Sequence, residues 1–209
     1  MTIDSKLITY NDLERLYNSG KSMFEISQIY GCSPNKVVYW MRKYNISRRS
    51  RSDSAYVKQN PLGDPFKIKT RLAKADAFLY GLGLGIFWGE GSKSPQISSL
   101  RVANTDPDLI RTFRDFLVTI YGLSEKRFSY SIVCFNDIGP DVARAYWASQ
   151  LKILPERFGK ITTIPVQGKG TYRKKSQYGV CTIQGNNVKL QKLVFEQIDK
   201  IRRKYMKVA

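Results

Sequence analysis

The sequence contains no histidine among its 209 residues, and it has only three cysteines. The lack of histidine excludes nucleases that use a histidine base, Ser-His-Asp hydrolases and Cys2His2 zinc fingers. Cys32, Cys134 and Cys181 lie far apart, each within an apolar pattern, so we expect buried thiols and no zinc site. Any catalysis must therefore depend on carboxylates, lysine and a metal ion.

Acidic residues are also scarce. There are 17 Asp and Glu against 35 Lys and Arg, which gives a net charge of +18. With 12% aromatic residues the chain does not have the composition of a disordered tail, and its charge favours a polyanionic partner, most often nucleic acid. An anionic membrane is the alternative, but neither end shows a basic amphipathic anchor, a lipidation signal or a signal peptide. We therefore expect a cytoplasmic protein that binds double-stranded DNA and no membrane.

Residues 1–52 are predicted to form an all-helical domain. Capping boxes that begin at Thr9 and Ser22, and a third start at Ser33-Pro34, predict short helices separated by tight turns. With small Ser27 and Gly31 between apolar positions, this segment resembles the helix-turn-helix pattern, in which Ser33–Tyr44 is the recognition helix. A three-helix module that binds protein would have the same core. The residues expected to contact DNA are Ser33, Asn35, Lys36, Tyr39, Arg42 and Lys43, of which Asn35 and Tyr39 are expected to contact bases.

Residues 53–75 are predicted to be a basic arm and linker. From Lys36 to Lys74 there are eleven basic residues and two acids, too long a run for one solvated helix face. The segment Ile46–Arg51 resembles the arms that run from helix-turn-helix units into the minor groove. The turn-forming sequence Asn60–Pro65 marks the domain boundary. The arm adds three expected DNA contacts, Arg48, Arg49 and Arg51.

The stretch Asp76–Gly91 is apolar almost all the way round a helix, yet it contains several glycines. Each interior glycine destabilises a helix by roughly 0.5–1 kcal/mol relative to alanine, so close packing must offset the loss. Gly81, Gly85 and Gly89 recur every four residues and form one groove that admits a second backbone. The run is too short to span a membrane. We therefore predict that a second helix of a soluble protein packs on Gly81, Gly85 and Gly89.

Glu90 is a carboxylate at the C-terminal end of this helix, where the helix dipole disfavours an anion. About a two-fold axis, two such carboxylates would repel unless a divalent cation lay between them. The segment Gly85–Gly91 resembles the second part of the LAGLIDADG signature of homing endonucleases, although Trp88 replaces the earlier acid of that signature. The resemblance implies that Glu90 binds Mg²⁺ and that Gly85 and Gly89 are close-packing positions. Because the chain carries one copy of the signature, the resemblance also implies a homodimer in which a second chain completes the groove. No nucleotide cofactor is expected. The alternative is a helix buried in its own domain, with Glu90 paired to Lys93 in solvent.

Residues 76–209 are predicted to form an α+β domain. Strands are expected over 96–103, 128–135 and 178–184, and helices over 107–121, 140–151 and 188–204. This order is compatible with the αββαββα core of the LAGLIDADG family, in which a saddle of strands lies on DNA. Only fourteen residues, Ser92–Thr105, precede the next helix, so we expect a shortened sheet.

The segment Arg157–Lys175 contains six basic residues and no acid, which favours phosphate contacts. An ordinary solvated loop is the alternative interpretation of this segment. The residues expected to contact phosphate here are Arg173, Lys174 and Lys175.

The leading hypothesis is a metal-dependent, site-specific DNA endonuclease of the homing type, in which two chains each contribute Glu90 to the catalytic site. Lys93 and Arg101, chosen from their positions, are expected to neutralise charge beside the scissile phosphate. The competing hypothesis is a non-catalytic transcription regulator that retains a LAGLIDADG-like fold. The net charge also permits an RNA-binding module, but no aromatic RNA-binding motif supports one.

Overall fold

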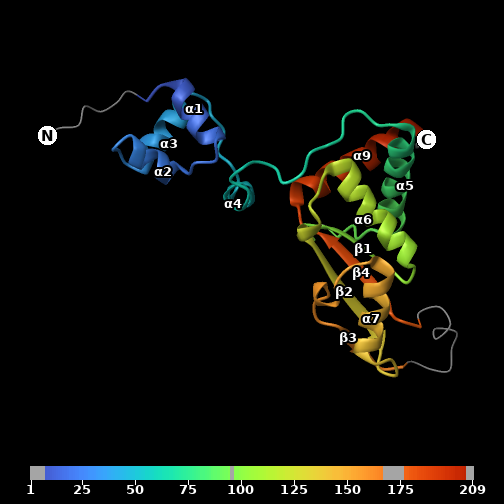
Figure 1. Ribbon diagram of the computed structural model, residues 1–209. Coiled ribbons are helices and arrows are strands. Elements are labelled where there is room, and N and C mark those ends of the chain that lie inside the picture. The colour runs from blue at the N-terminus through green and yellow to red at the C-terminus, as the bar shows by residue number, and fades with distance from the viewer. Residues whose placement is uncertain (1–7, 95–96, 167–176, 206–209) are drawn as a thin grey trace. The chain divides into compact units, whose positions relative to one another are not determined.

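A computed structural model describes residues 8–94, 97–166 and 177–205 (Figure 1). The chain divides after Pro65 into two compact units, here called unit 1 and unit 2. Unit 1 is helical, whereas unit 2 combines helices with a four-stranded sheet, so the expected α+β class is confirmed at this level. Within the described ranges, no helix has both the length and the apolar character that crossing a membrane requires.

Unit 1 begins with three short helices whose starts match the capping sequences. Thr9 accepts a hydrogen bond from the Asp12 amide at 3.2 Å, and Ser33 accepts one from the Lys36 amide at 3.3 Å. Ser22 and Glu25 form a complete capping box, and the Ser22 amide hydrogen bond to the Glu25 carboxylate lowers the pKa of Glu25. The predicted helix starts are therefore confirmed. The helices are α1 (Tyr10–Asn18), α2 (Met23–Ile29) and α3 (Pro34–Lys43).

A fourth helix, α4 (Arg51–Gln59), extends into the stretch that was predicted to be a basic arm and linker. The helix forms for a local reason. Ser50 caps the helix by accepting a hydrogen bond from the Asp53 amide at 3.1 Å, and Tyr56 is buried. The capping serine and the buried tyrosine thus stabilise a helix in a segment that is rich in basic residues.

Unit 2 alternates helices and strands. In the described residues a single strand lies between its first two helices, and a helix follows β2, so the expected αββαββα layout is not reproduced. The short connection leaves room for only one regular strand, together with an isolated bridge between Gly91 and Val102. The main elements are α5 (Lys74–Glu90), β1 (Leu100–Asn104), α6 (Pro107–Tyr121), β2 (Phe128–Phe135), α7 (Pro140–Leu151), β3 (Thr162–Ile164), β4 (Val180–Gly185) and α9 (Val188–Tyr205).

The sheet has the order β1-β4-β2-β3. Strand β4 pairs antiparallel with β1 and β2, and β3 adds a parallel edge beside β2. Val102 lies opposite Ile183, and Ile183 lies opposite Tyr130, so these three side chains share one face. Their burial shows that this face meets the core, and the alternation of side chains directs the neighbouring residues to the other face.

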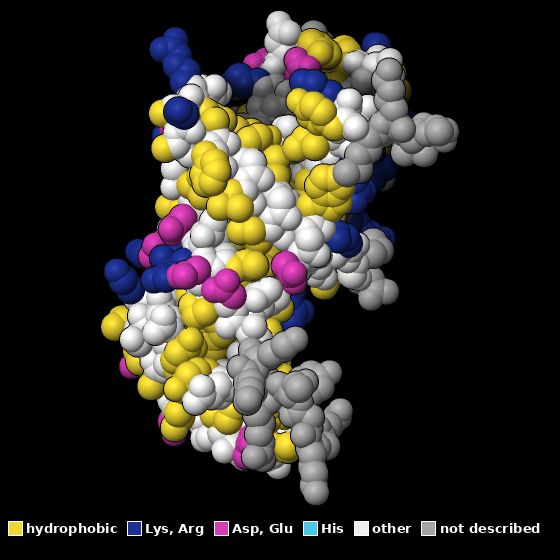
Figure 2. Space-filling view, turned by 90° about the vertical axis from the view of Figure 1, so that its right-hand side faces the viewer, with side chains coloured by type: hydrophobic (Ala, Val, Ile, Leu, Met, Phe, Trp, Pro, Cys, Tyr) yellow, Lys and Arg dark blue, Asp and Glu magenta, His cyan; other side chains and the backbone are white. Residues whose placement is uncertain are grey.

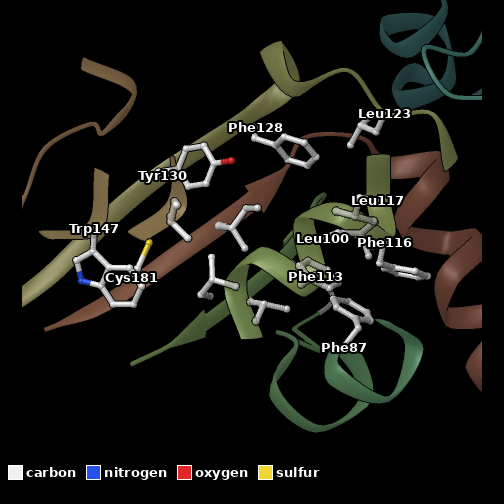
Figure 3. Close-up of a cluster of buried hydrophobic side chains, with 14 of the residues drawn as sticks. Phe87, Leu100, Phe113, Phe116, Leu117, Leu123, Phe128, Tyr130, Trp147 and Cys181 are labelled. Carbon is white, nitrogen blue, oxygen red and sulfur yellow. The ribbon is translucent and has the colours of Figure 1, made fainter. Parts of the chain in front are cut away.

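The core of unit 2 lies between this sheet face and the helices (Figure 3). Phe87 of α5 stacks on Phe113 of α6, with ring centroids 5.9 Å apart. Trp147 of α7 is fully buried, and its indole N–H donates to the Tyr178 carbonyl at 2.9 Å. Helices distant in the sequence therefore share one set of large apolar side chains.

Alanine substitutions at two glycines of α5 should have opposite effects on the free energy of unfolding. A methyl group at Gly83 would overlap the Phe116 ring, whereas one at Gly81 meets no atom within 4 Å. We expect Gly83→Ala to lower the free energy of unfolding by about 1–3 kcal/mol through overpacking. The matched Gly81→Ala should raise it by about 0.5–1 kcal/mol because alanine favours the helix. Urea unfolding of dilute monomer measures both, and equal effects of the two substitutions would contradict this packing.

Candidate functional site

Helix α3 places a row of polar side chains on the surface of unit 1. Val37 and Met41 are fully buried and hold the helix against α1 and α2. Tyr39 is 59% exposed, on a helix whose polar side chains are free of the core. The predicted contact residues Ser33, Asn35, Lys36, Tyr39, Arg42 and Lys43 are all exposed.

The C-terminal half of α3 is stiffened by aromatic contacts. Trp40 stacks on Tyr44 with ring centroids 5.4 Å apart, and the Tyr44 hydroxyl donates to the Ile8 carbonyl at 2.8 Å. The Lys43 ammonium lies 4.6 Å from the centre of the Trp40 ring. These contacts hold the exposed end of α3 in one orientation before any ligand binds.

The three arginines predicted in the basic arm have different environments. The Arg49 guanidinium lies 4.0 Å from the centre of the Tyr17 ring and donates to the Lys21 carbonyl at 2.6 Å. Arg49 therefore holds the segment before α4 against α1 and is only half-exposed. Arg48 and Arg51 are exposed, as a contact role requires. The predicted contacts Arg173, Lys174 and Lys175 lie outside the described residues.

The glycine ridge of α5, formed by Gly81, Gly85 and Gly89, is open. A methyl group added at any of the three would meet no atom within 4 Å. Phe78 and Leu82 extend the ridge as an apolar face and are 74% and 42% exposed. The side of unit 2 that carries α5 faces the viewer in Figure 2, where hydrophobic and uncharged surface dominates the upper half and a row of acidic and basic side chains crosses the middle.

The opposite face of α5 is the one that packs in its own domain. Gly83, Leu84 and Phe87 are buried there, against α6 and α9. The helix thus buries one apolar face and leaves a second one uncovered by any described residue. The alternative, a helix that packs against its own domain, therefore describes one face of α5, while the described residues leave the glycine ridge uncovered.

The candidate catalytic residues meet at one corner of unit 2. Directly after Glu90, Gly91 pairs with Val102 of β1, and the Ser92 amide donates to the Arg101 carbonyl at 2.9 Å. This pairing brings the backbones around Glu90, Lys93 and Arg101 together, and all three residues are exposed. Within the described part of the chain Glu90 has no ion pair, so the alternative pairing with Lys93 is not found.

The corner around Glu90 offers few ligand atoms for a metal ion. Among the described residues, no three His, Cys, Asp or Glu side chains lie close enough together to hold one. Mg²⁺, however, is commonly bound by one or two carboxylates together with water and substrate phosphates. One exposed Glu90 per chain fits that requirement only when a second chain or a phosphate supplies further oxygen atoms.

The second face of the sheet was missed as a candidate site. The strands β1, β2 and β4 carry one cation there, Arg101, and no acid, and Gln184 donates to Asn186 at 2.7 Å. The alternation in β2, buried Phe128 next to exposed Ser129, is the sequence signal that could have identified this face. Its polar side chains are Arg101, Ser129, Ser131, Thr182 and Gln184, of which Thr182 is buried and the others are exposed or half-exposed.

The cysteines offer no reactive site in the described structure. Cys134 and Cys181 are buried, as expected, and burial raises the pKa of Cys181 to about 12. Cys32 is half-buried instead of buried, because it follows Gly31 in the turn between α2 and α3. A thiol with a raised pKa stays protonated at neutral pH and is a poor nucleophile.

Comparisons of the chain with protein-family models, with curated proteins and with solved structures find no match.

The two neighbouring arginines of the arm supply a matched test. Arg49→Ala removes the contact with the Tyr17 ring and the hydrogen bond to Lys21, and we expect it to destabilise unit 1 by about 1–2 kcal/mol. Arg48→Ala should change stability by less than about 0.5 kcal/mol because its side chain is exposed. Hydrogen exchange of the α1 amides in the full chain measures both. Equal protection in the two variants would mean that Arg49 is not a structural link.

Proposed function

We propose that the protein binds double-stranded DNA as a homodimer and cleaves it in a metal-dependent reaction, in the manner of single-motif LAGLIDADG endonucleases. The observation that carries this proposal is the glycine ridge of α5, which the described residues leave open. The ridge ends at an exposed Glu90 that has no ion pair with a described residue, beside strands β1, β2 and β4, which carry no acid. A ridge that admits a backbone, an acid and a polar strand surface within one unit are the parts that such an enzyme needs.

Unit 1 supplies the first DNA-binding surface in this proposal. Helix α3 presents Asn35 and Tyr39 on its exposed side, and Arg42 and Lys43 follow at its C-terminal end. An amide side chain near the N-terminus of an exposed helix can bond to adenine edges in the major groove. The flanking cations suit the phosphate backbone and would fix the helix in register.

The free face of the sheet in unit 2 supplies the second surface. Ser129, Ser131 and Gln184 offer donors and acceptors, while Arg101 is the one cation on β1, β2 and β4. Hydroxyl and amide groups can bond to base edges as well as to phosphates, and strands can enter the major groove. Because these strands carry a single cation, the sheet face is suited to reading sequence more than to neutralising phosphates.

A second copy of this chain is the proposed occupant of the glycine ridge. No side chain of the described residues covers Gly81, Gly85 or Gly89, so two identical helices can cross there with their backbones in contact. An isologous contact would place both Glu90 residues near the two-fold axis and relate the two sheet faces by symmetry. Such a dimer favours a palindromic or nearly palindromic target.

Each Glu90 would hold a Mg²⁺ ion through its carboxylate oxygens. When bound, the ion supplies an activated water and charge stabilisation for phosphodiester hydrolysis. Glu90 itself contributes a negative oxygen ligand at the sheet corner, where no described residue neutralises it. Lys93 and Arg101 are proposed to attract the phosphate backbone to this corner and to offset its charge.

A non-cutting regulator is the second candidate function. The observation that favours it is the single exposed carboxylate at the corner, because the described residues of one chain contain no cluster of three potential ligands. A dimer of this kind would use the same two DNA-binding surfaces without hydrolysis. The two functions differ only in whether the phosphodiester bond is cleaved.

The nuclease proposal is tested with Mg²⁺ and a plasmid library. We expect the wild type to cut and Glu90→Gln to lose at least about 100-fold in rate, because a neutral amide is a poor Mg²⁺ ligand. Both proteins should bind duplex DNA with an affinity that falls steeply with salt. The control Glu196→Gln removes the same charge from an exposed position on α9 and should cut normally. Equal cutting by wild type and Glu90→Gln would exclude Glu90, and tight binding without cutting by either protein would favour the regulator.

The dimer is tested separately by filling the ridge. Gly85→Leu should abolish the dimer in sedimentation velocity, because a branched side chain separates the two backbones. The control Ala145→Leu adds the same side chain to an exposed position of α7 and should leave the dimer intact. If Gly85→Leu sediments as the wild-type dimer does, the interface lies elsewhere.

A further inference from the structure

The chain that joins the two units is much shorter than the sequence indicates. Unit 1 continues through α4 to Asn60, which is only 9% exposed. The Asn60 side-chain amide donates to the Tyr56 carbonyl at 2.8 Å, and its backbone amide is directed at the carbonyls of Tyr56 and Val57. The end of α4 is therefore closed at Asn60. A turn follows, in which the Gly63 amide donates to the Asn60 carbonyl at 3.0 Å.

Unit 2 begins well before α5. The backbone amides of Lys67 and Lys69 donate to the carbonyls of Tyr121 and Ile120, each at 2.8 Å. Gly122 has a positive φ of 59°, and its Cβ position lies 3.4 Å from the Lys67 carbonyl oxygen, so the end of α6 fits closely against this strap. The strap, residues 66–73, thus forms part of unit 2.

A second contact fixes the far end of the strap. The Lys69 ammonium pairs with Asp76 at 2.8 Å, and its hydrogen bond is the main cause of the lowered pKa of Asp76. The same carboxylate accepts a hydrogen bond from the Ala73 amide at 3.0 Å. The strap is therefore held at its start by α6 and at its end by the first turn of α5.

Only residues 61–65 remain as a connection. The chain from Asn60 to Phe66 can span at most roughly 22 Å, whereas a free linker over residues 53–75 would span roughly 80 Å. Along duplex DNA these reaches correspond to about 6 and more than 20 base pairs. Pro61 and Pro65 restrict the connection further, because each fixes its own φ and limits the residue before it.

We propose that residues 61–65 act as a spacer that fixes the distance between two elements of the DNA target. One element is bound by α3 of unit 1, and the other is bound by the sheet face of unit 2. The spacer leads into the strap, which is hydrogen-bonded to the end of α6. This inference rests on the proposed DNA binding and adds a specificity rule to it.

The test selects binding sites for the full chain from a random-sequence duplex library. In each half-site, the wild type should select two sequence blocks separated by one spacing. Inserting about ten Gly and Ser residues after Leu62 adds up to roughly 35 Å of reach and should spread the spacing over several base pairs. Leu62 is fully exposed, so neither core should be disturbed. The control Leu62→Ser changes the same position without changing the length and should keep the single spacing.

A third variant identifies which sequence block α3 binds. Asn35→Ala combined with Tyr39→Ala should lose one block and retain the other, which identifies the block bound by α3. Wild-type blocks at many spacings, or a single spacing that the insertion leaves unchanged, would overturn the spacer. A wild type that fails to retain any duplex would overturn DNA binding itself. Unchanged thermal unfolding of the insertion variant confirms that both units still fold.

Discussion

The packing of α5 against α6 is the contact on which the rest of unit 2 depends. Gly83 admits the Phe116 ring against the α5 backbone, and Phe87 stacks on Phe113 one turn further along. This contact decides which side of α5 is buried and leaves Gly81 and Gly85 outside. It also fixes the end of α5, from which the chain passes directly into pairing with β1. The position of the acid at the corner is thus a consequence of aromatic packing within the helix layer.

Local signals in the sequence predicted the elements well where the start and the end were both encoded. Strand β2 and the helices α6 and α7 match their predicted bounds, because Pro107 and Pro140 open these helices and Gly122 closes α6 in a left-handed conformation. Strand β1 begins at Leu100, later than expected, because its register is set by β4 through long-range pairing. No short stretch of the sequence determines the register between β1 and β4.

The candidate site was predictable by residue type, but the direction of each side chain was not. Neighbouring arginines in the arm look equivalent in the sequence, yet Tyr17 captures the guanidinium of Arg49 and leaves Arg48 exposed. Arg157, in the segment predicted to contact phosphate, instead donates to the carbonyls of Glu125 and Phe128. A cation in an apparently basic run can be a structural donor, and only the fold shows which carbonyl groups remain to be satisfied.

The two units have separate cores joined by an exposed segment, so recombination can exchange one unit without disturbing the other. Leu62 is fully exposed, and the Cβ position of Gly63 meets no atom within 4 Å, so recombination at this segment would join intact folds. A descendant could exchange its first sixty or so residues for another helical module without repacking α5 or the sheet. Under the function proposed here, such an exchange would give the protein a different DNA target site without changing the reaction that it catalyses.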